Sequence, residues 1–353
     1  MKRKDYRKGR GAQYNPANPF LKNEYVTEHP EGLDEAWEIG PQTEFFRENP
    51  QKIINRVESP DLGLSYSMNP YQGCEHGCVY CYARNSHQYW GYGAGLDFER
   101  KIIVKENAPS VLAAQLENPN WKVMPMMLAG NTDCYQPIEG KLRITRRLLE
   151  VLLQFRHPVS LITKNALILR DLDLLRALND LDLVHVNVSL TTLDEKLRQK
   201  LEPRTASGAK RLDVIRQIAG AGIPVNAMLA PIIPGLNDQE IPELVRQAAA
   251  AGASSAAYTV VRLNGAIGEI FEDWLRKSYP DRADKVLRQI ASCHGGHLND
   301  SVFGRRLKGE GPWAETIASL FRIARQKYLP NCHMKPYNLE HFCGRSGKQL
   351  RLF

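Results

Sequence analysis

Short apolar runs alternate with longer stretches of helical periodicity along most of the chain. The expected strands are the runs at residues 64–68, 123–128, 159–163, 183–190, 225–233 and 256–263. Between and after them, apolar side chains recur every three or four residues, as on the buried face of an amphipathic helix. The expected helices cover residues 142–155, 166–178, 209–221, 238–251, 265–277, 281–292 and 313–328.

The predicted strands have the composition of strands that are buried on both faces. They are mostly continuous apolar runs, whereas a half-exposed strand alternates apolar and polar positions. Their alternation with helices indicates an α/β fold with a parallel sheet. Both an open doubly wound sheet and a closed or partial β/α barrel satisfy this pattern, and periodicity does not choose between them.

The ends of the chain differ from this central α/β region. Residues 1–60 contain several prolines and no sustained periodicity, so they are expected to form an irregular, basic N-terminal extension. Residues 61–265 hold the strand–helix alternation and form the expected core. Residues 266–353 predict a helical, basic C-terminal extension.

Composition is that of a globular protein, with 43% hydrophobic and 24% charged residues in 353. No apolar run approaches the roughly 20 residues that span a bilayer. The basic first residues lead into no apolar signal core. We therefore expect a cytoplasmic protein with no membrane partner.

The net charge of +8 is concentrated at the two ends. Residues 1–11 carry a net charge of +5 and residues 301–353 a net charge of +7, so the remaining residues carry −4. Basic ends on a near-neutral core fit an anionic partner, most simply nucleic acid. The alternative is that both ends are solvated basic segments without a partner.

Three cysteines crowd together at Cys74, Cys78 and Cys81. In a cytosolic protein such a cluster indicates metal binding or catalysis rather than disulfides. Three thiolates at this spacing can ligate three irons of a cubane and leave the fourth iron open. A structural zinc site is the alternative, but it usually takes four ligands, often as two separated pairs.

The other cysteines are scattered, and several stand next to histidines. Cys293 is followed by His294 and His297, and the C-terminal region contains Cys332-His333 and His341-x-Cys343. This composition allows an auxiliary metal site. Unrelated thiols and surface histidines are the alternative.

Polar residues follow most of the predicted strands. The chain reads Asn131-Thr132-Asp133 after the second strand, Lys164 after the third, Ser189 at the end of the fourth and Arg262 near the end of the sixth. In parallel β/α folds the chemistry gathers at the carboxyl ends of the strands. This edge is therefore expected to bind a charged ligand, although each residue alone is also a usual helix cap or loop residue.

The segment CEHGCVYCY at residues 74–82 resembles the radical S-adenosylmethionine (radical SAM) signature, Cys-x3-Cys-x-aromatic-Cys. Its context resembles the branch of spore photoproduct lyase and DNA repair photolyase-like proteins: NPYQGC at 69–74, NTDCYQP at 131–137, TKN at 163–165 and EPR at 202–204. The resemblance covers roughly residues 64–265. It implies a partial (β/α)6 TIM-type barrel with residues 61–265 as the radical SAM core.

The resemblance also implies cofactors and roles. Cys74, Cys78 and Cys81 would hold a 4Fe–4S cluster that binds S-adenosylmethionine, and Tyr80 would pack near its adenine. Either Thr132 or Asp133 would meet the methionine amino group. Lys164 and Ser189 would contact the methionine carboxylate or the ribose. Arg204 is a further cofactor-site candidate, although a salt bridge between Glu202 and Arg204 that caps the helix near residue 209 is the alternative.

Tyr82 and Cys134 are the catalytic candidates. In the lyase a cysteine after the second strand donates a hydrogen atom to the product radical, helped by a tyrosine that Tyr82 matches. At that cysteine's position this chain has Gly130 or Asn131, and Cys134 follows a few residues later. Cys134 is therefore either a displaced hydrogen donor or a buried, inert thiol.

Three functions follow from these patterns. The first is a radical SAM enzyme that cleaves S-adenosylmethionine reductively and acts on nucleic acid, with repair-like chemistry. The second is a radical SAM enzyme that modifies a peptide or small molecule. The third is a non-catalytic iron–sulfur module, for which a cosubstrate site has no use. An enzyme of either kind needs an electron donor such as flavodoxin or ferredoxin, and the pattern leaves the oligomeric state open.

Overall fold

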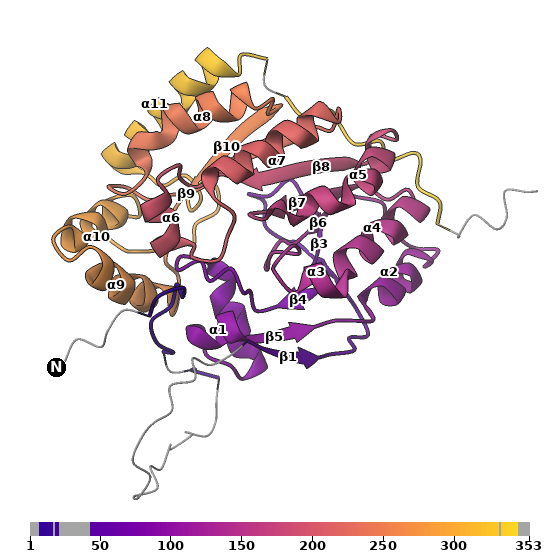
Figure 1. Cartoon of the computed structure of the whole chain (residues 1–353), viewed down its shortest axis with the longest axis horizontal. Helices are drawn as coiled ribbons and strands as arrows, with labels where there is room; N and C mark the ends of the chain where they lie inside the picture. The colour runs from indigo at the N-terminus through magenta and orange to yellow at the C-terminus, as the bar shows by residue number, and fades with distance from the viewer. Residues whose placement is uncertain (1–6, 17, 21–42, 332, 345–353) are drawn as a thin grey trace, which may run out of the picture.

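A computed structural model describes residues 7–16, 18–20, 43–331 and 333–344. Its main sheet holds six parallel strands that lie side by side in chain order (Figure 1). They are β3 (Tyr66–Met68), β6 (Met126–Leu128), β7 (Val159–Thr163), β8 (Val184–Ser189), β9 (Val225–Ile232) and β10 (Ser255–Val260). A seventh strand, β2 (Ile54–Arg56), pairs antiparallel with β3 at one end of this sheet.

Strand order decides between the two predicted architectures. In a doubly wound sheet the order reverses at a switch point, whereas in a barrel each right-handed crossover moves in the same direction. Here each parallel strand follows its predecessor, and the connecting helices line the outside of the sheet (Figure 1). In the described part of the chain β10 and β2 end the sheet without pairing to each other. The predicted partial barrel is confirmed.

The outer helices agree closely with the predicted ones. They are α4 (Ile144–Gln154), α5 (Leu172–Asn179), α7 (Gly208–Gly220) and α8 (Ile241–Ala250), preceded in two cases by the 3-10 turns η2 (Ala166–Asp171) and η3 (Asp238–Glu240). Helix α4 buries Leu148, Leu149 and Leu152, which its sequence spacing places on one face. Helix α7 begins at Ser207, whose hydroxyl accepts a hydrogen bond from the Lys210 amide.

Several short elements have no periodic signal. A three-stranded sheet contains β1 (Glu44–Arg47), β5 (Lys101–Val104) and β4 (Tyr71–Gln72). The short helices are η1 (Tyr82–Trp90), α1 (Leu96–Arg100), α2 (Ala108–Leu116), α3 (Glu139–Leu142) and α6 (Glu195–Leu201). Strands β1 and β2 lie within residues 1–60, which the pattern predicts to be irregular. Both expose most of their side chains, so neither produces an apolar run.

The C-terminal helices pack onto the barrel. They are α9 (Ile267–Ser278), α10 (Ala283–Ser292) and α11 (Gly311–Tyr328), and α11 lies beside α8 (Figure 1). Phe321 of α11 packs against Tyr258 of β10, with ring centroids 4.7 Å apart. Residues 333–344 then run along the amino ends of the strands, where the Asn338 amide donates to the Asp182 carbonyl and the Cys343 amide to the Phe155 carbonyl. No helix in the described ranges is long and apolar enough to cross a membrane.

Residues 297–310, which we call the seam segment, join the two ends of the open sheet. On the β10 side, the Val260 amide donates to the Leu307 carbonyl and the Leu263 amide to the Leu298 carbonyl. On the other side, Asp61, between β2 and β3, accepts from the Gly304 amide and pairs with the Arg306 guanidinium at 2.5 Å. The seam segment therefore bridges the gap that an incomplete barrel leaves.

Candidate active site

The three clustered cysteines lie in the loop of residues 73–81, between β4 and η1. Gly73 and Gly77 have φ angles of +79° and +68°, which favour glycine, and a Cβ on either would approach neighbouring atoms to 2.9 Å. The Cys74 amide donates to the Phe98 carbonyl at 2.8 Å, and the Val79 amide to the Leu201 carbonyl at 3.1 Å. Both glycines and these backbone bonds hold the loop in one conformation.

The cysteine thiols form a donor set for a metal cluster. All three are free; Cys74 and Cys78 are buried and Cys81 is half-buried. Burial raises the pKa of each thiol, and the other two thiols raise the pKa of Cys74 further, so the three groups lie within electrostatic range. Buried, mutually repelling thiols fit a soft metal cluster that holds each as a thiolate.

No group of three or more His, Cys, Asp or Glu side chains converges on a single metal ion within the described ranges. This finding bears on the two alternatives that need a single metal ion: a structural zinc site at the clustered cysteines and an auxiliary site at the C-terminal cysteines. A cubane instead takes one thiolate on each of three irons. Cys332 lies outside the described residues, and Cys293 is fully buried at the end of α10.

An N-terminal segment covers the cysteine loop. The amides of Gly11 and Ala12 donate to the Glu99 carboxylate at 3.3 and 2.6 Å, and this carboxylate also pairs with the buried Arg84 guanidinium at 2.6 Å. A Cβ on Gly11 would come within 1.7 Å of the Gly77 carbonyl oxygen. Residues far apart in the sequence therefore seal one side of this loop.

Asp133 ties the cysteine loop to the carboxyl ends of β6 and β7. Its carboxylate accepts from the Thr163 hydroxyl and the Lys164 amide, both at 2.8 Å, and lies 3.3 Å from His76 Nδ1. Although burial opposes ionisation, His76 and these hydrogen bonds lower the pKa of Asp133 to about 2. Thr132 is also occupied, because its buried hydroxyl donates to the Tyr71 carbonyl. Both predicted cofactor residues thus have structural partners.

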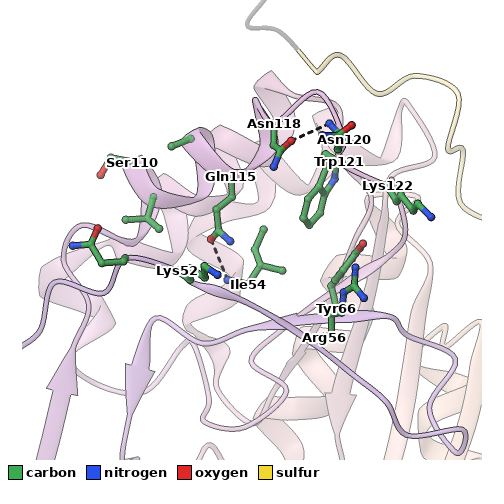
Figure 2. Close-up of a pocket in the computed structure, with 13 residues that line it drawn as sticks. Lys52, Ile54, Arg56, Tyr66, Ser110, Gln115, Asn118, Asn120, Trp121 and Lys122 are labelled. Carbon is green, nitrogen blue, oxygen red and sulfur yellow. Dashed lines mark hydrogen bonds between the residues drawn. The ribbon is translucent and has the colours of Figure 1, made fainter.

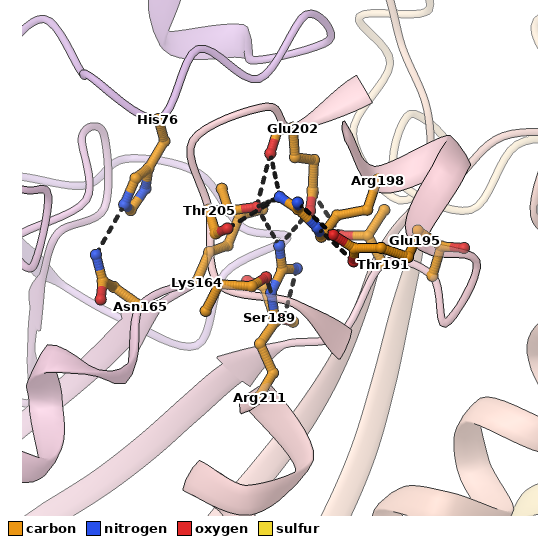
Figure 3. A network of polar contacts seen from close by, with 12 residues as sticks. His76, Lys164, Asn165, Ser189, Thr191, Glu195, Arg198, Glu202, Thr205 and Arg211 are labelled. Atoms are coloured by element: carbon orange, nitrogen blue, oxygen red, sulfur yellow. Dashed lines mark hydrogen bonds and ion pairs between the residues drawn. The ribbon is translucent and has the colours of Figure 1, made fainter. Parts of the chain in front are cut away.

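A buried polar network centres on Glu202 and Arg211 (Figure 3) and includes Tyr80. The Tyr80 hydroxyl donates to Glu202, and Glu202 pairs with Arg211 at 2.5 Å. Thr191 donates to the same carboxylate at 2.7 Å. The alternative pair of Glu202 with Arg204 is wrong. The Arg204 guanidinium instead lies 3.5 Å from Glu75, because Glu202 turns into the barrel while Arg204 follows the cysteine loop.

Arg211 is the network member that sequence reasoning missed. Its helix, α7, reads as an ordinary amphipathic segment, and nothing in the local pattern distinguishes an inward-facing arginine from an outward-facing one. The side chain is buried, and it also donates to the Ser189 carbonyl at 3.1 Å. Ser189 itself is 1% exposed at the end of β8.

Lys164 lies between this network and the cysteines. Its Nζ is 5.8 Å from the centroid of the Tyr80 ring. Burial disfavours its charge, but Cys78 and Glu202 outweigh that effect and raise the pKa of Lys164. The ammonium has no hydrogen-bond partner among the residues that the structure describes, so it remains available for an anionic ligand.

Tyr82 and Cys134 lie in opposite surroundings. Tyr82 is 52% exposed, and its hydroxyl donates to the Gly130 carbonyl at the end of β6. Cys134 is 0% exposed in the main hydrophobic core, and burial raises the pKa of its thiol. This packing favours the buried, inert interpretation of Cys134 over the donor.

Arg262 extends the site toward the seam segment. It follows β10, and burial together with Arg306 lowers its pKa. Its charge interacts with the Tyr82 hydroxyl, and no acid in the described ranges pairs with it. Nearby on the seam segment, Phe303 is 54% exposed and lies under the Arg306 guanidinium, 4.4 Å from the ring centroid. These residues form a partly cationic, aromatic rim, which we call the mouth.

The basic ends contribute less to this site than their charge suggests. Residues 1–6 and 345–353 lie outside the described residues. Arg10 donates to the Glu99 carbonyl, and Arg305 and Arg306 pair with Asp300 and Asp61. These three described arginines are therefore engaged within the fold.

Comparison with known proteins identifies the family. A family model described as the radical SAM superfamily matches residues 68–248, which include the cysteine loop. An uncharacterized protein of Mycobacterium tuberculosis (strain H37Rv) is 35% identical over 234 residues, covering 65% of this chain and 69% of the relative. An uncharacterized protein of Methanocaldococcus jannaschii is 31% identical over 202 residues, covering 57% of this chain and 73% of the relative.

The fold is shared with a solved enzyme structure. Spore photoproduct lyase complexed with dinucleoside spore photoproduct superimposes with a TM-score of 0.58 at 17% identity, covering 81% of this chain and 80% of that chain. The predicted radical SAM fold and superfamily are confirmed by these findings. Because the family model spans more than half of it, this chain belongs to the radical SAM superfamily, whose members use a 4Fe–4S cluster and S-adenosylmethionine.

Proposed function

We propose that this protein is a radical SAM enzyme acting on nucleic acid, with Cys74, Cys78 and Cys81 as the cluster ligands. The carrying observation is the convergence, at one edge of the barrel, of three free thiols and the Lys164 ammonium, which has no hydrogen-bond partner among the described residues. When bound, the cluster supplies the electron that cleaves S-adenosylmethionine to a 5′-deoxyadenosyl radical. The protein's own groups bind, orient and shield that cosubstrate.

In this proposal each residue has a defined task. Lys164 neutralises the methionine carboxylate, because an ammonium forms a charge-assisted hydrogen bond with a carboxylate. The Tyr80 ring, fixed by Glu202, forms the wall for the adenine. Ser189 lines the ribose side. The cysteine loop is positioned by three residues. Arg204 contacts Glu75 in the loop, Thr132 bonds to β4 and Asp133 bonds to the backbone just after β7.

The substrate proposal rests on the mouth. Arg262 forms no ion pair with a described acid, and exposed Tyr82 and Phe303 offer aromatic surfaces beside it. A cation flanked by aromatic rings suits a phosphate and its bases. A structure of spore photoproduct lyase, which shares this fold, has bound AdoMet and dinucleoside spore photoproduct, and this supports a nucleic-acid substrate.

We further propose that residues 61–265 form the catalytic core, with residues 1–60 and 266–353 as extensions that cover it. The electron would come from a small cytoplasmic donor such as flavodoxin or ferredoxin. Repair of a photoproduct is not part of the proposal, because Cys134 lies in the core and this branch's donor position holds Gly130 or Asn131.

The cluster assignment is tested by anaerobic reconstitution of single variants Cys74→Ala, Cys78→Ala and Cys81→Ala. Each should lose the bound iron and the formation of 5′-deoxyadenosine from S-adenosylmethionine. Cys343→Ala, a half-buried thiol outside the loop, serves as the matched control and should retain both. A cysteine-loop variant that retains four irons per chain and full cleavage activity would overturn the assignment.

The substrate class is tested with Arg262→Gln. We expect weaker binding of a labelled oligonucleotide and a salt dependence reduced by about one phosphate contact. Arg288→Gln on the exposed face of α10 is the charge-matched control. If Arg262→Gln binds as the unaltered protein does, or if no oligonucleotide binds at low salt, the substrate is a peptide or a small molecule.

A further inference from the structure

A cleft lies along the β2 edge of the main sheet, and no residue of the cysteine loop lines it. It has a volume of about 760 Å³ and lies between β2, β3 and α2 (Figure 2). Tyr66 is the first residue of β3, and Ile54 of β2 pairs with Met68, the last residue of β3, so the cleft runs along this edge of the sheet. Its volume is within the usual range for small-molecule sites.

The charged groups of the cleft have one sign. Lys52, Arg56 and Lys122 line it, and no Asp or Glu does. None of the three cations forms an ion pair with a residue in the described ranges. Three unneutralised cations around one cleft favour an anionic ligand, since each lowers the free energy of a bound phosphate.

An aromatic platform stands beside these cations. The Trp121 ring stacks on Tyr66 with centroids 4.7 Å apart and planes 28° apart, and it lies 5.8 Å from the His157 ring. His157 in turn meets Phe342 of the C-terminal segment. A ring that is packed on one side and borders a cleft is a preformed stacking surface, so a planar ligand loses little entropy in binding it.

Amide groups complete the lining. Gln115 accepts hydrogen bonds from the amides of Ile53 and Ile54 through its oxygen, which fixes its side chain and leaves its NH₂ group toward a ligand. Asn118 and Asn120 lie next to Trp121 (Figure 2). Amides are both donors and acceptors, so they suit the polar edge of a base.

We propose that this cleft is a second binding site, for a nucleotide unit, distinct from the mouth. The phosphate lies among Lys52, Arg56 and Lys122, the base stacks against Trp121, and the amides meet the base edge. The unit comes either from a free nucleotide or from a single-stranded segment of a nucleic acid. The inference does not depend on the catalytic proposal, because no cleft residue belongs to the cysteine loop or the mouth.

The test uses the full chain with two probes, adenosine 5′-monophosphate and a short labelled single-stranded oligonucleotide. In the triple variant Lys52→Gln, Arg56→Gln, Lys122→Gln, we expect binding to weaken at least tenfold at low salt. The salt dependence of oligonucleotide binding should fall by about two to three phosphate contacts. The matched control is a second triple variant that removes the same charge from exposed helical positions: Lys196→Gln, Lys285→Gln, Arg288→Gln.

A second variant, Trp121→Leu, separates stacking from charge. Loss of a stacked base typically costs about tenfold or more in affinity. Loss of both probes in the triple variant supports a free nucleotide, and loss of the oligonucleotide alone supports a strand. Equal binding by the triple variant and its control overturns the site, and unchanged binding by folded Trp121→Leu overturns the stacking. Cleavage of S-adenosylmethionine without substrate should be unchanged in all these variants, so failure here is distinguishable from failure of the catalytic proposal.

Discussion

Lys164 is the residue whose surroundings most directly suggest a ligand contact. Its ammonium faces Cys78, Glu202 and the Tyr80 ring without a hydrogen-bond partner among the described side chains. Asp133, which the sequence also assigns to the cosubstrate, has its carboxylate occupied by His76, Thr163 and the Lys164 amide. The two residues should therefore respond differently to substitution.

Lys164→Met should weaken S-adenosylmethionine binding ten- to a hundredfold while iron content stays normal. The physical reason is the loss of one charge-assisted hydrogen bond, about 1.5–3 kcal/mol. Equilibrium binding to the reconstituted protein measures the effect, with exposed Lys141→Met as the control. Asp133→Ala should instead reduce iron retention, because it releases His76 from β7. Unaltered cosubstrate affinity in Lys164→Met would remove this residue from the site.

Substitutions of Cys134 distinguish a hydrogen-atom donor from a thiol that only fills space in the core. Since it is fully buried in the core, Cys134→Ala should cost about 1 kcal/mol of unfolding free energy and leave 5′-deoxyadenosine formation unchanged. Cys134→Ser should cost more, because it buries a hydroxyl among apolar groups. Chemical denaturation of both variants checks the order. A changed product distribution in a normally stable Cys134→Ala would instead favour the hydrogen-donor role.

At the scale of elements, the seam segment connects the two open edges of the six-stranded barrel. An incomplete barrel leaves two sheet ends with unpaired backbone groups, and such groups favour pairing with another chain. Residues 297–310 satisfy part of this need through Val260 and Leu263, and they reach Asp61 on the far side. The side chains of Asp61 and Arg306 are 7% and 16% exposed, so this ion pair is largely shielded.

Asp61→Asn should loosen the seam segment locally. It removes the charge that holds Arg306 and weakens the bond to the Gly304 amide, a loss of about 1–3 kcal/mol in local opening. Hydrogen exchange at the Gly304 and Val260 amides measures it, and both should exchange faster. The control, Asp284→Asn, breaks an exposed pair with Arg276, which is worth little, and should leave these amides unchanged. Equal protection in both variants would show that Asp61 does not anchor the segment.

At the scale of the whole molecule, residues 7–16 and 333–344 both pack against the core. Residues 7–16 seal the cysteine loop through Glu99, and the C-terminal segment crosses the amino ends of β7 and β8 (Figure 1). The catalytic edge and the proposed nucleotide cleft share no lining residue. Each end of the barrel is bordered by a different terminal segment.

Gly11→Ala should disturb the sealed side of the cysteine loop. A Cβ at this position would lie 1.7 Å from the Gly77 oxygen, a distance that forces residues 7–16 away from the loop. The reconstituted cluster should then decay faster in air, followed by its absorption, and the unfolding free energy should fall. Gly220→Ala adds the same methyl group where nothing lies within 4 Å, so it should leave the cluster lifetime unchanged and should not lower the unfolding free energy. Equal cluster lifetimes in the two variants would contradict the sealing role.

The sequence by itself determined the order of the six parallel strands and the long helices along the chain, the boundaries of those helices and the position of the cysteine loop. These properties are local: apolar periodicity reflects burial of one helix face, and three thiols within eight residues are close in any fold. Tertiary structure alone decided the strand order, the Glu202–Arg211 pair, the sealing by Gly11 and the cationic cleft. Each of these features joins residues from separate elements or turns a helix side chain inward. Such contacts form only when the sheet has assembled, so no local sequence pattern encodes them.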